Sequence, residues 1–290
     1  MNPALLKNFF NRGQKGVIFA SNTLNKPEFS VKISMCIHRT IQVGCLDSML
    51  KIMMCKNPKV TVSNAMGDAL IDRARSREAS DFFRNTQDDV LLMIDDDIQF
   101  NPLDAIKVAR LAYEKKGIAC GAYVIKKEQF GWITCKPLEN SEPIMFSSDA
   151  VPIEVKWPGT GFLAIHRNVF QDLIDEAHKF HEYHPNHIDL LHPTDLKFWD
   201  FFMPMKYKFP NGDKIELSED WAFGEKCRNI GYRIWLDPSI RLTHWGLYGY
   251  QLSDLCRPER IEHERISYTD FKKTLVPRDE GKQVQLGIPK

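Results

Sequence analysis

The feature that most constrains this chain is an apolar run that ends in three aspartates. Residues 90–94 are all apolar, and Asp95, Asp96 and Asp97 follow without a break. A continuous apolar run of this length is typical of a central strand in a parallel sheet that is covered on both faces. The aspartates then lie at the carboxyl end of that strand, where open α/β sheets bind their ligands. We therefore predict an α/β fold with a site at this strand end.

Strand-like and helix-like segments alternate on both sides of this run, which favours a mainly parallel sheet flanked by helices. Strands are predicted at 31–37, 60–62, 118–124, 132–135, 153–155, 162–165, 233–236 and 240–243, and helices at 44–54, 68–83, 102–116, 168–183 and 218–229. Residues 184–216 are rich in Pro, His and aromatic residues and are predicted to form a long ordered loop. We divide the chain into an N-terminal extension (1–30), one α/β domain (31–250) and a C-terminal tail or arm (251–290).

Composition excludes several classes of protein. Of the 290 residues, 43% are hydrophobic and 27% are charged, which is a globular balance and not that of a disordered or fibrous chain. The formal net charge of +1 gives no overall attraction to nucleic acid or anionic lipid. No apolar stretch approaches the ~20 residues of a membrane span. With seven singly scattered cysteines, we expect a soluble chain with reduced thiols, in the cytoplasm or, for a viral chain, in the host cytoplasm.

The three aspartates are candidates for metal binding. Adjacent carboxylates repel one another unless a cation or a hydrogen-bond donor compensates, and hard oxygens suit Mg²⁺ or Mn²⁺. Alternate residues of an extended segment point the same way, so Asp95 and Asp97 are expected to share a ligand while Asp96 faces elsewhere. The structural alternative is a solvated acidic turn that caps the next helix.

A second acidic string, Ser218-Glu219-Asp220-Trp221, lies at a predicted helix start. The helix dipole stabilises ionised carboxylates there, and the simplest role of the string is N-capping. The functional alternative makes Asp220 or Glu219 a general base near an acceptor hydroxyl.

Four other features have a structural and a functional interpretation. His244 either is structural or completes the coordination of a cation held by Asp97. Gly159-Thr160-Gly161 is either a turn before a strand or a site of close backbone approach to a ligand. Arg73 and Arg75 cannot share a helix face, so one is expected to reach a diphosphate and the other to lie at the surface. A histidine series (His178, His181, His184, His187 and His192) favours a hydrated loop over a zinc site.

Taken in order, six strings resemble the motifs of a bacterial and viral group of GT-A type glycosyltransferases related to the large inverting family 2. They are DRARS at 72–76, LLMIDDDIQF at 91–100 with the DxD motif, GAYVIKK at 121–127, GTGFLAIHRNVF at 159–170, LSEDWAFGEKCRNIGYRIWLDPSI at 217–240 and LTHWG at 242–246. The resemblance covers residues 31–250 and implies a GT-A fold, which is Rossmann-like with a central, mainly parallel sheet.

The resemblance also implies roles for individual residues. Asp95 matches the first acid of the DxD motif and Asp97 its metal-binding acid, while His244 matches a histidine that contacts the metal. Asp220 matches the acid often assigned as the base, with Glu219 beside it. The candidate donor-binding residues, from the residue patterns and the resemblance together, are Asp95, Asp96, Arg75, Arg73, Gly159, Thr160 and Gly161.

Together these features predict a glycosyltransferase that moves a hexose or pentose from a nucleotide-sugar to an acceptor hydroxyl, with Mn²⁺ or Mg²⁺ as cofactor. Inversion at the sugar carbon is expected, and retention is the open alternative. A UDP-sugar is the expected donor, and the acceptor is a glycan, lipid, protein or modified nucleobase. Trp157, Trp221 and Trp245 are candidates for stacking on sugars, with core packing expected for at least one. The alternatives are a nucleotidyltransferase acting on sugar phosphates and an inactive protein that binds sugars or nucleic acid. The C-terminal tail is a candidate oligomer contact.

Overall fold

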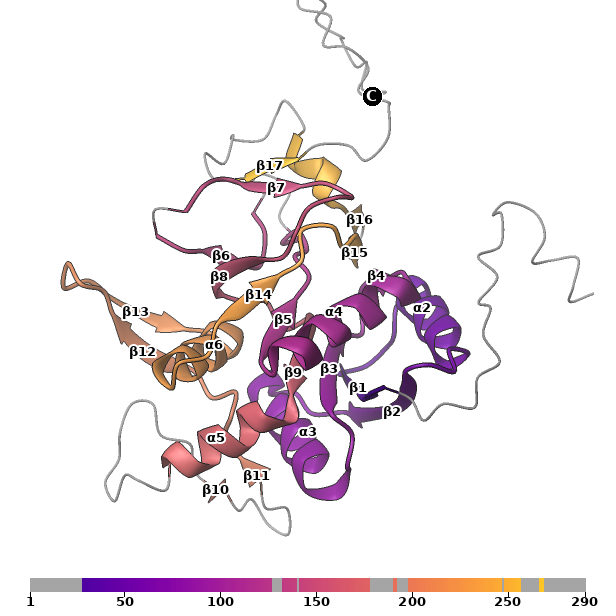
Figure 1. The fold of residues 1–290 in the computed structure, drawn as a ribbon, viewed down its shortest axis with the longest axis horizontal. Coiled ribbons are helices and arrows are strands. Elements are labelled where there is room, and N and C mark those ends of the chain that lie inside the picture. The colour runs from indigo at the N-terminus through magenta and orange to yellow at the C-terminus, as the bar shows by residue number, and fades with distance from the viewer. Residues whose placement is uncertain are drawn as a thin grey trace, which may run out of the picture.

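The computed structural model of the chain describes residues 28–126, 132–139, 141–177, 190–191, 198–246, 248–256 and 266–268. Its centre is an eight-stranded sheet with the order β2-β1-β3-β9-β5-β14-β8-β6 (Figure 1). The strands of this sheet are β1 (Ser30–Ile37), β2 (Lys59–Met66), β3 (Val90–Asp95), β5 (Ile118–Cys120), β6 (Lys136–Pro137), β8 (Ile153–Trp157), β9 (Phe162–His166) and β14 (Ile234–Leu236).

The sheet is mixed. Strand β1 is parallel to β2 and β3, and β14 is parallel to β5. Strand β9 runs antiparallel between β3 and β5, and β8 runs antiparallel to both β14 and β6. The predicted α/β class is confirmed, and two strands break the parallel pattern: β8, and β9, which follows the Gly159-Thr160-Gly161 turn.

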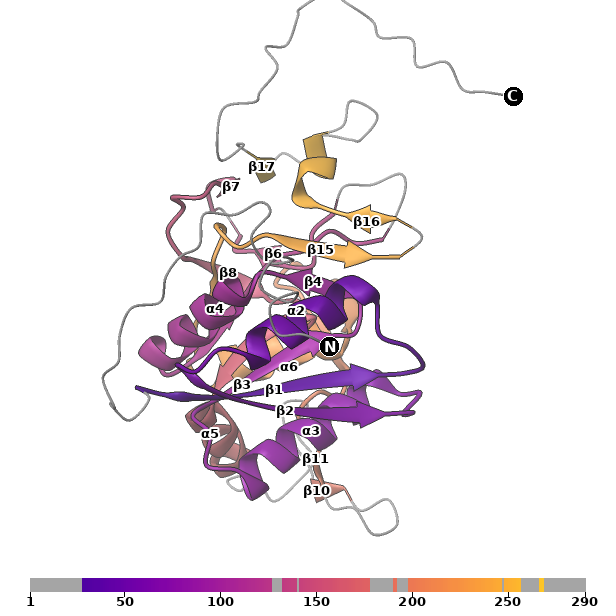
Figure 2. The ribbon, with the colours of Figure 1, turned by 90° about the vertical axis from the view of Figure 1, so that its right-hand side faces the viewer.

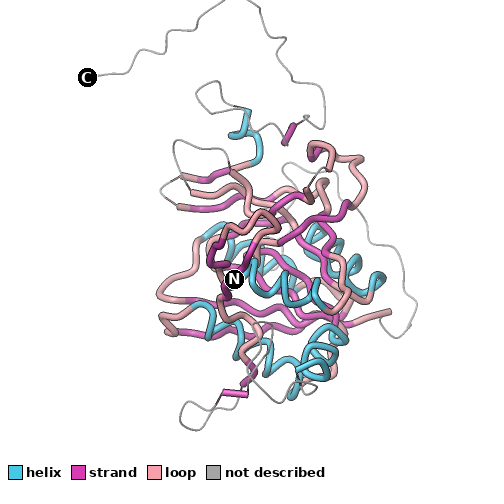
Figure 3. The backbone as a smooth tube through the Cα atoms, turned by 90° about the vertical axis from the view of Figure 1, so that its left-hand side faces the viewer, coloured by secondary structure: helices cyan, strands magenta, loops and turns pink. Residues whose placement is uncertain are grey.

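Helices cover both faces of the sheet: α2 (Val43–Met53), α3 (Ile71–Asn85), α4 (Pro102–Lys115), α5 (Arg167–Ala177) and α6 (Glu219–Asn229). Helices α2 and α4 lie on one side and α3 and α5 on the other (Figure 2). Figure 3 shows the helices in cyan around the magenta strands. Strand β3 serves both layers, because Leu92 packs with the α2–α4 core while Leu91 and Met93 pack with the core of α3, α5 and α6. The apolar run is therefore covered on both faces, as predicted. Among the described residues, no helix has the length and apolarity to span a membrane.

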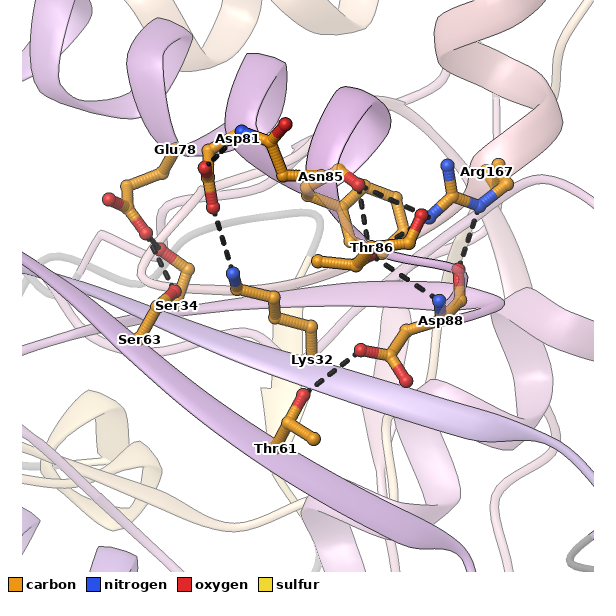
Figure 4. A network of polar contacts seen from close by, with 11 residues as sticks. Lys32, Ser34, Thr61, Ser63, Glu78, Asp81, Asn85, Thr86, Asp88 and Arg167 are labelled. Atoms are coloured by element: carbon orange, nitrogen blue, oxygen red, sulfur yellow. Dashed lines mark hydrogen bonds and ion pairs between the residues drawn. The ribbon is translucent and has the colours of Figure 1, made fainter.

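Helix α3 is held on β1 and β2 by polar contacts as well as by its apolar residues (Figure 4). The hydroxyls of Ser34 and Ser63 both donate to Glu78, at 2.6 and 2.8 Å. The Lys32 ammonium contacts Asp81 at 2.9 Å. These side chains alternate along β1 with the apolar residues that face α2 and α4, so one strand presents a polar and an apolar face. The contacts set the position of α3, which carries Arg75.

Helix α4 begins and ends by different means. Asn101 accepts a hydrogen bond from the Leu103 amide at 2.9 Å, and Pro102 follows as the first helical residue, a common helix start. The helix ends at Lys115, and the C-cap residue Lys116 takes the left-handed conformation (φ 47°). The Gly117 amide donates back to the Ala112 carbonyl at 3.1 Å.

Shorter strands lie outside the central sheet. They are β4 (Ile98–Phe100), β7 (Ile144–Phe146), β10 (Leu190–Leu191), β11 (Phe198–Trp199), β12 (Met205–Lys208), β13 (Lys214–Leu217), β15 (Leu242–Trp245), β16 (Gly249–Tyr250) and β17 (Ile266–Tyr268), and a 3-10 helix, η1, covers Leu252–Cys256. Strand β15 pairs with both β4 and β16. Within the predicted tail, β17 pairs in parallel with β7.

Several sequence predictions differ from the structure. The strand predicted at 118–124 ends at Cys120. The strand predicted at 132–135 is reduced to a single bridge between Ile133 and Val124. The predicted loop 184–216 contains the β12–β13 hairpin and a buried segment in which Phe201 and Phe202 are fully buried among core rings. The five histidines from His178 to His192 lie outside the described residues.

Candidate functional site

The three aspartates lie where β3 ends and turns into β4. Asp95 is the last residue of β3, and the next two residues form the turn. The Asp95 amide donates to the Gly161 carbonyl at 3.1 Å, and the Trp245 amide donates to the Asp97 carbonyl at 2.8 Å. Backbone contacts to two distant segments therefore fix this turn, and the acidic side chains project from a fixed frame.

Asp95 is joined through Arg75 to the second acidic string. The Arg75 guanidinium donates to Asp95 Oδ1 at 2.7 Å through one terminal nitrogen and to Glu219 through the other. The Arg75 side chain is only 5% exposed. Burial raises the pKa of Glu219, and Arg75 opposes that rise. One buried cation thus connects β3, α3 and the start of α6.

In the Gly159-Thr160-Gly161 turn, Gly161 packs against Tyr123 and Asp95, and Gly159 packs against Thr134 and Tyr123. The Gly161 amide donates to the Tyr123 hydroxyl at 2.8 Å. A Cβ at Gly161 would lie 2.5 Å from that hydroxyl and 2.7 Å from Asp95 Oδ2, and one at Gly159 would lie 2.6 Å from the Thr134 side chain. The glycines are therefore required by close packing of the protein itself. Burial is also the main cause that raises the pKa of Tyr123.

Asp97 faces a different set of groups. Lys126 donates to Asp97 Oδ2, and His244 Nε2 lies 3.5 Å from Asp97 Oδ1. Burial raises the pKa of Asp97, but His244 and Lys126 together outweigh it and lower the pKa below the usual value. Neither cation-bearing side chain contacts Asp95, so the two ends of the DxD motif have separate partners.

His244 and Asp97 make an incomplete cation-binding corner. His244 Nδ1 lies 2.7 Å from the Val124 carbonyl and so acts as a donor there. In a neutral ring, Nε2 is then an acceptor that faces Asp97 Oδ1, an atom that is buried and makes no hydrogen bond. The 3.5 Å distance between His244 Nε2 and Asp97 Oδ1 is too long for a good hydrogen bond. Two facing acceptors fit a positive charge between them: either a proton on Nε2, which is the state in which His244 lowers the pKa of Asp97, or a metal cation.

The third predicted metal ligand is not part of this corner, because Asp95 is turned toward Arg75. Within the described ranges, no three His, Cys, Asp or Glu side chains converge to hold a metal ion. The predicted sharing of one ligand by Asp95 and Asp97 is thus not seen in this arrangement. Asp97 and His244 fit part of a cation shell.

Asp96 and Asp220 are the remaining acids of the site. Burial raises the pKa of Asp96 to about 6, with further contributions from Asp97 and Asp95. Asp220 Oδ1 accepts from the Trp221 amide at 2.8 Å and from the Ser218 hydroxyl. Burial also raises the pKa of Asp220. Ser218 occupies the N-cap position of α6 but makes no side-chain cap hydrogen bond, so the contact with a first-turn amide comes from Asp220 and not from Ser218.

Several candidate residues lie apart from these acids. Arg73 makes a two-point contact with Asp68, at 2.7 and 2.9 Å, and does not contact the acidic turn. Trp157 is fully buried and donates to Glu225 at 2.8 Å, which makes it the core tryptophan that the sequence analysis expected. Trp221 and Trp245 are half-buried and donate to Thr134 and Gln99, respectively.

Lys126 and Tyr123 are the residues that the sequence analysis did not assign. Both lie in the GAYVIKK string at 121–127, which gave a signal only as part of a resemblance. Tyr123 lies within the strand predicted at 118–124 and Lys126 lies beyond it, but β5 ends at Cys120 and the chain continues without regular structure.

Comparisons with known proteins give no family. No protein-family model and no curated protein matches the sequence. Among solved structures, A197 from STIV matches with 15% identity and a TM-score of 0.48, over 75% of this chain and 86% of that one. The 4-diphosphocytidyl-2C-methyl-D-erythritol synthase of Anaerococcus prevotii DSM 20548 matches with 8% identity and a TM-score of 0.32, over 54% of this chain and 78% of that one. Neither likeness carries an assignment of function, which rests on the chain's own geometry.

Proposed function

We propose that this chain is a glycosyltransferase that moves a sugar from a nucleotide-sugar to an acceptor hydroxyl. The observation that carries the proposal is the Arg75 link between Asp95 and Glu219. It joins the acids at the carboxyl end of β3 to the acids at the start of α6. Asp95 and Glu219 are 124 positions apart in the chain. A transfer of this kind needs both a donor side and an acceptor side in one site.

Asp220 is the residue that we assign to the acceptor side. A general base must accept a proton in the transition state, and a raised pKa makes a carboxylate a stronger base. Burial raises the pKa of Asp220, while two hydrogen bonds to Oδ1 fix the position of its carboxylate. Asp220 would take the proton of the attacking hydroxyl, which favours inversion at the sugar carbon.

The donor side is the turn that carries Asp97. A divalent cation, Mn²⁺ or Mg²⁺, would be held there by Asp97 and His244, and when bound it would neutralise charge on the departing diphosphate. The unsatisfied Asp97 Oδ1 and the facing His244 Nε2 support this part of the proposal. A UDP-sugar is the donor with which we would begin.

A purified-protein assay tests the proposal. UDP-sugars and other nucleotide-sugars are incubated with Mn²⁺ or Mg²⁺, and release of nucleoside diphosphate is measured. In a parallel reaction, nucleoside triphosphates and sugar 1-phosphates replace the nucleotide-sugars, and release of pyrophosphate is measured. Nucleoside diphosphate release supports sugar transfer, and pyrophosphate release instead supports a nucleotidyltransferase. Cation-independent binding with no turnover of any donor supports an inactive binding protein.

The variant Asp220→Asn then tests the base. We expect unchanged affinity for the nucleotide-sugar and a loss of transfer of roughly 10²–10⁴-fold, the usual size of general-base catalysis. Asp175→Asn, the same change on the exposed face of α5, is the matched control and should leave both quantities unchanged. Transfer within about twofold of wild type in Asp220→Asn would remove this residue from the reaction.

A further inference from the structure

Lys126 is the cation of this site that can reach a ligand. Among the described residues, the acids of the β3 turn and of the α6 start form ion pairs with two side chains that are always cationic, Arg75 and Lys126. His244 makes one further contact, with Asp97. The Arg75 side chain is 5% exposed and both of its terminal nitrogens are engaged. Lys126 is 33% exposed and contacts a single carboxylate.

The chain makes specific room for Lys126. Its side chain passes over Gly246, where a Cβ would lie 3.2 Å from Lys126 Cδ and 3.8 Å from Cε. Gly246 does not have a positive φ, so space and not backbone conformation is what a side chain there would change. The same short segment supplies His244 to one oxygen of Asp97, while Lys126 contacts the other. The string LTHWG therefore supplies one contact to this carboxylate and leaves room for the other.

The charge balance of the site gives Lys126 a role. Asp95, Asp96, Asp97, Glu219 and Asp220 make the region strongly acidic, and such a region repels an anionic ligand unless cations compensate. A lysine ammonium is a compact, mobile point charge that binds phosphate oxygens well. Its exposed fraction and its flexible stem allow it to leave Asp97 without disturbing the core.

We propose that Lys126 binds the diphosphate of the donor, and that its ammonium exchanges between Asp97 and a phosphate oxygen. This inference rests on the proposed function, since it names the part of the donor that Lys126 contacts. It has two consequences of opposite sign. Loss of the Lys126 charge weakens diphosphate binding, and it strengthens binding of a divalent cation at Asp97 because one competing positive charge is gone.

The test uses the full chain and three probes: Mn²⁺ alone, inorganic pyrophosphate, and UDP with saturating Mn²⁺, each titrated by calorimetry. For Lys126→Gln we expect about threefold to tenfold tighter Mn²⁺ binding, and about tenfold or more weaker binding of pyrophosphate and UDP. Lys126→Arg should keep pyrophosphate and UDP affinity within a few-fold of wild type. Lys51→Gln, which removes an exposed Lys51–Asp47 pair on α2, is the matched control and should change none of the three.

Gly246→Ala supplies a second variant that leaves the lysine in place. A methyl group at this position displaces the Lys126 stem, so we expect the same two signs with smaller size. Thermal unfolding of each variant checks that the fold is kept.

The outcomes separate this inference from the proposed function. If UDP binds and Lys126→Gln binds it as wild type does, the inference is overturned while the donor assignment stands. If pyrophosphate binding depends on Lys126 but no nucleotide binds, the inference stands and the nucleotide-sugar donor is wrong. Weaker Mn²⁺ binding in Lys126→Gln would overturn the proposed competition, and absence of binding by all three probes in wild type would overturn both proposals.

Discussion

The two ends of the Asp95-Asp96-Asp97 turn are built in opposite ways. Asp95 faces a buried arginine that is locked between two carboxylates, whereas Asp97 faces a half-exposed lysine and an imidazole at 3.5 Å. The first end has the fixed geometry of a structural ion pair, and the second has an unsatisfied oxygen and a cation that can move. Neighbouring residues of one motif can thus have different roles, one in the stability of the site and the other in ligand binding. Measurements of unfolding free energy and of ligand affinity distinguish the two roles.

The largest effect on stability is expected from Arg75→Met, which breaks the Asp95 end. Removal of one partner from a fully buried pair costs about 3–5 kcal/mol. Here Asp95 and Glu219 keep 26% and 18% exposure, so we expect a loss of about 2–3 kcal/mol. Urea unfolding measures it. Arg75→Lys should recover only part of the loss, because one ammonium cannot make the two-sided contact. A variant as stable as wild type would contradict the structural role.

Gly161→Ala tests the packing of the same end from the other side. The new Cβ would lie 2.5 Å from the Tyr123 hydroxyl and 2.7 Å from Asp95 Oδ2, and overpacking of this kind costs about 1–3 kcal/mol. The double variant Gly161→Ala with Tyr123→Phe should regain part of that loss, since it removes the closest atom. Chemical denaturation of the single and double variants gives the comparison, and a silent Gly161→Ala would show that the turn adjusts freely.

Asp97→Asn should have a smaller effect on stability and a large effect on binding. We expect a loss of about 1 kcal/mol at most, because the Lys126 contact is partly exposed and screened by solvent. Cation-dependent binding of the nucleotide-sugar should be abolished, which calorimetry with and without Mn²⁺ measures. Unchanged Mn²⁺-dependent binding would remove Asp97 from the donor side.

The smallest effect, with the opposite sign, is expected from Asp96→Asn. Burial raises the pKa of Asp96 from 3.8 to about 6, so between about pH 4 and 6 the folded chain binds more protons than the unfolded chain. The unfolding free energy must then fall as pH rises through this window. Asp96→Asn removes that contribution, so in chelator-treated protein it should be slightly more stable than wild type at pH 7.5, by about 1 kcal/mol or less, and no more stable at pH 4. A gain that is independent of pH would contradict the raised pKa.

Much of the fold was predictable because most of its helices and strands show a regular spacing of apolar residues. The β3 run, the start of α4 at Pro102 and the alternation of strands and helices follow from local pattern. Strand direction does not follow from local pattern, because an apolar strand has the same composition whether it runs parallel or antiparallel. The strand at 162–165 was therefore predicted, but the antiparallel direction of β9 was not. Phe201 and Phe202 were assigned to a loop because a short aromatic segment shows no regular spacing of apolar residues. Their burial comes from contacts with the aromatic rings of other segments.

The acids of the site were found from sequence, but their partners were only partly found. Helical spacing showed that Arg73 and Arg75 diverge, yet it did not say which one faces β3. Lys126 and Tyr123 lie in an irregular segment after β5, where no periodicity predicts the direction of a side chain. Gly161 was noted as a residue that permits close approach, and the structure shows that the approaching groups are Tyr123 and Asp95 themselves.

The place of β9 in the sheet has a consequence for biosynthesis. Strands β3 and β5 are not paired with each other, and each is paired with β9, which lies about 40 residues beyond β5 in the chain. A nascent chain that has reached only β5 therefore presents two apolar strands with open edges, the kind of edge that pairs with other chains. The ribosome must release the Gly159–Gly161 turn and β9 before these edges close, so arrest or truncation ahead of residue 162 should yield an aggregation-prone product.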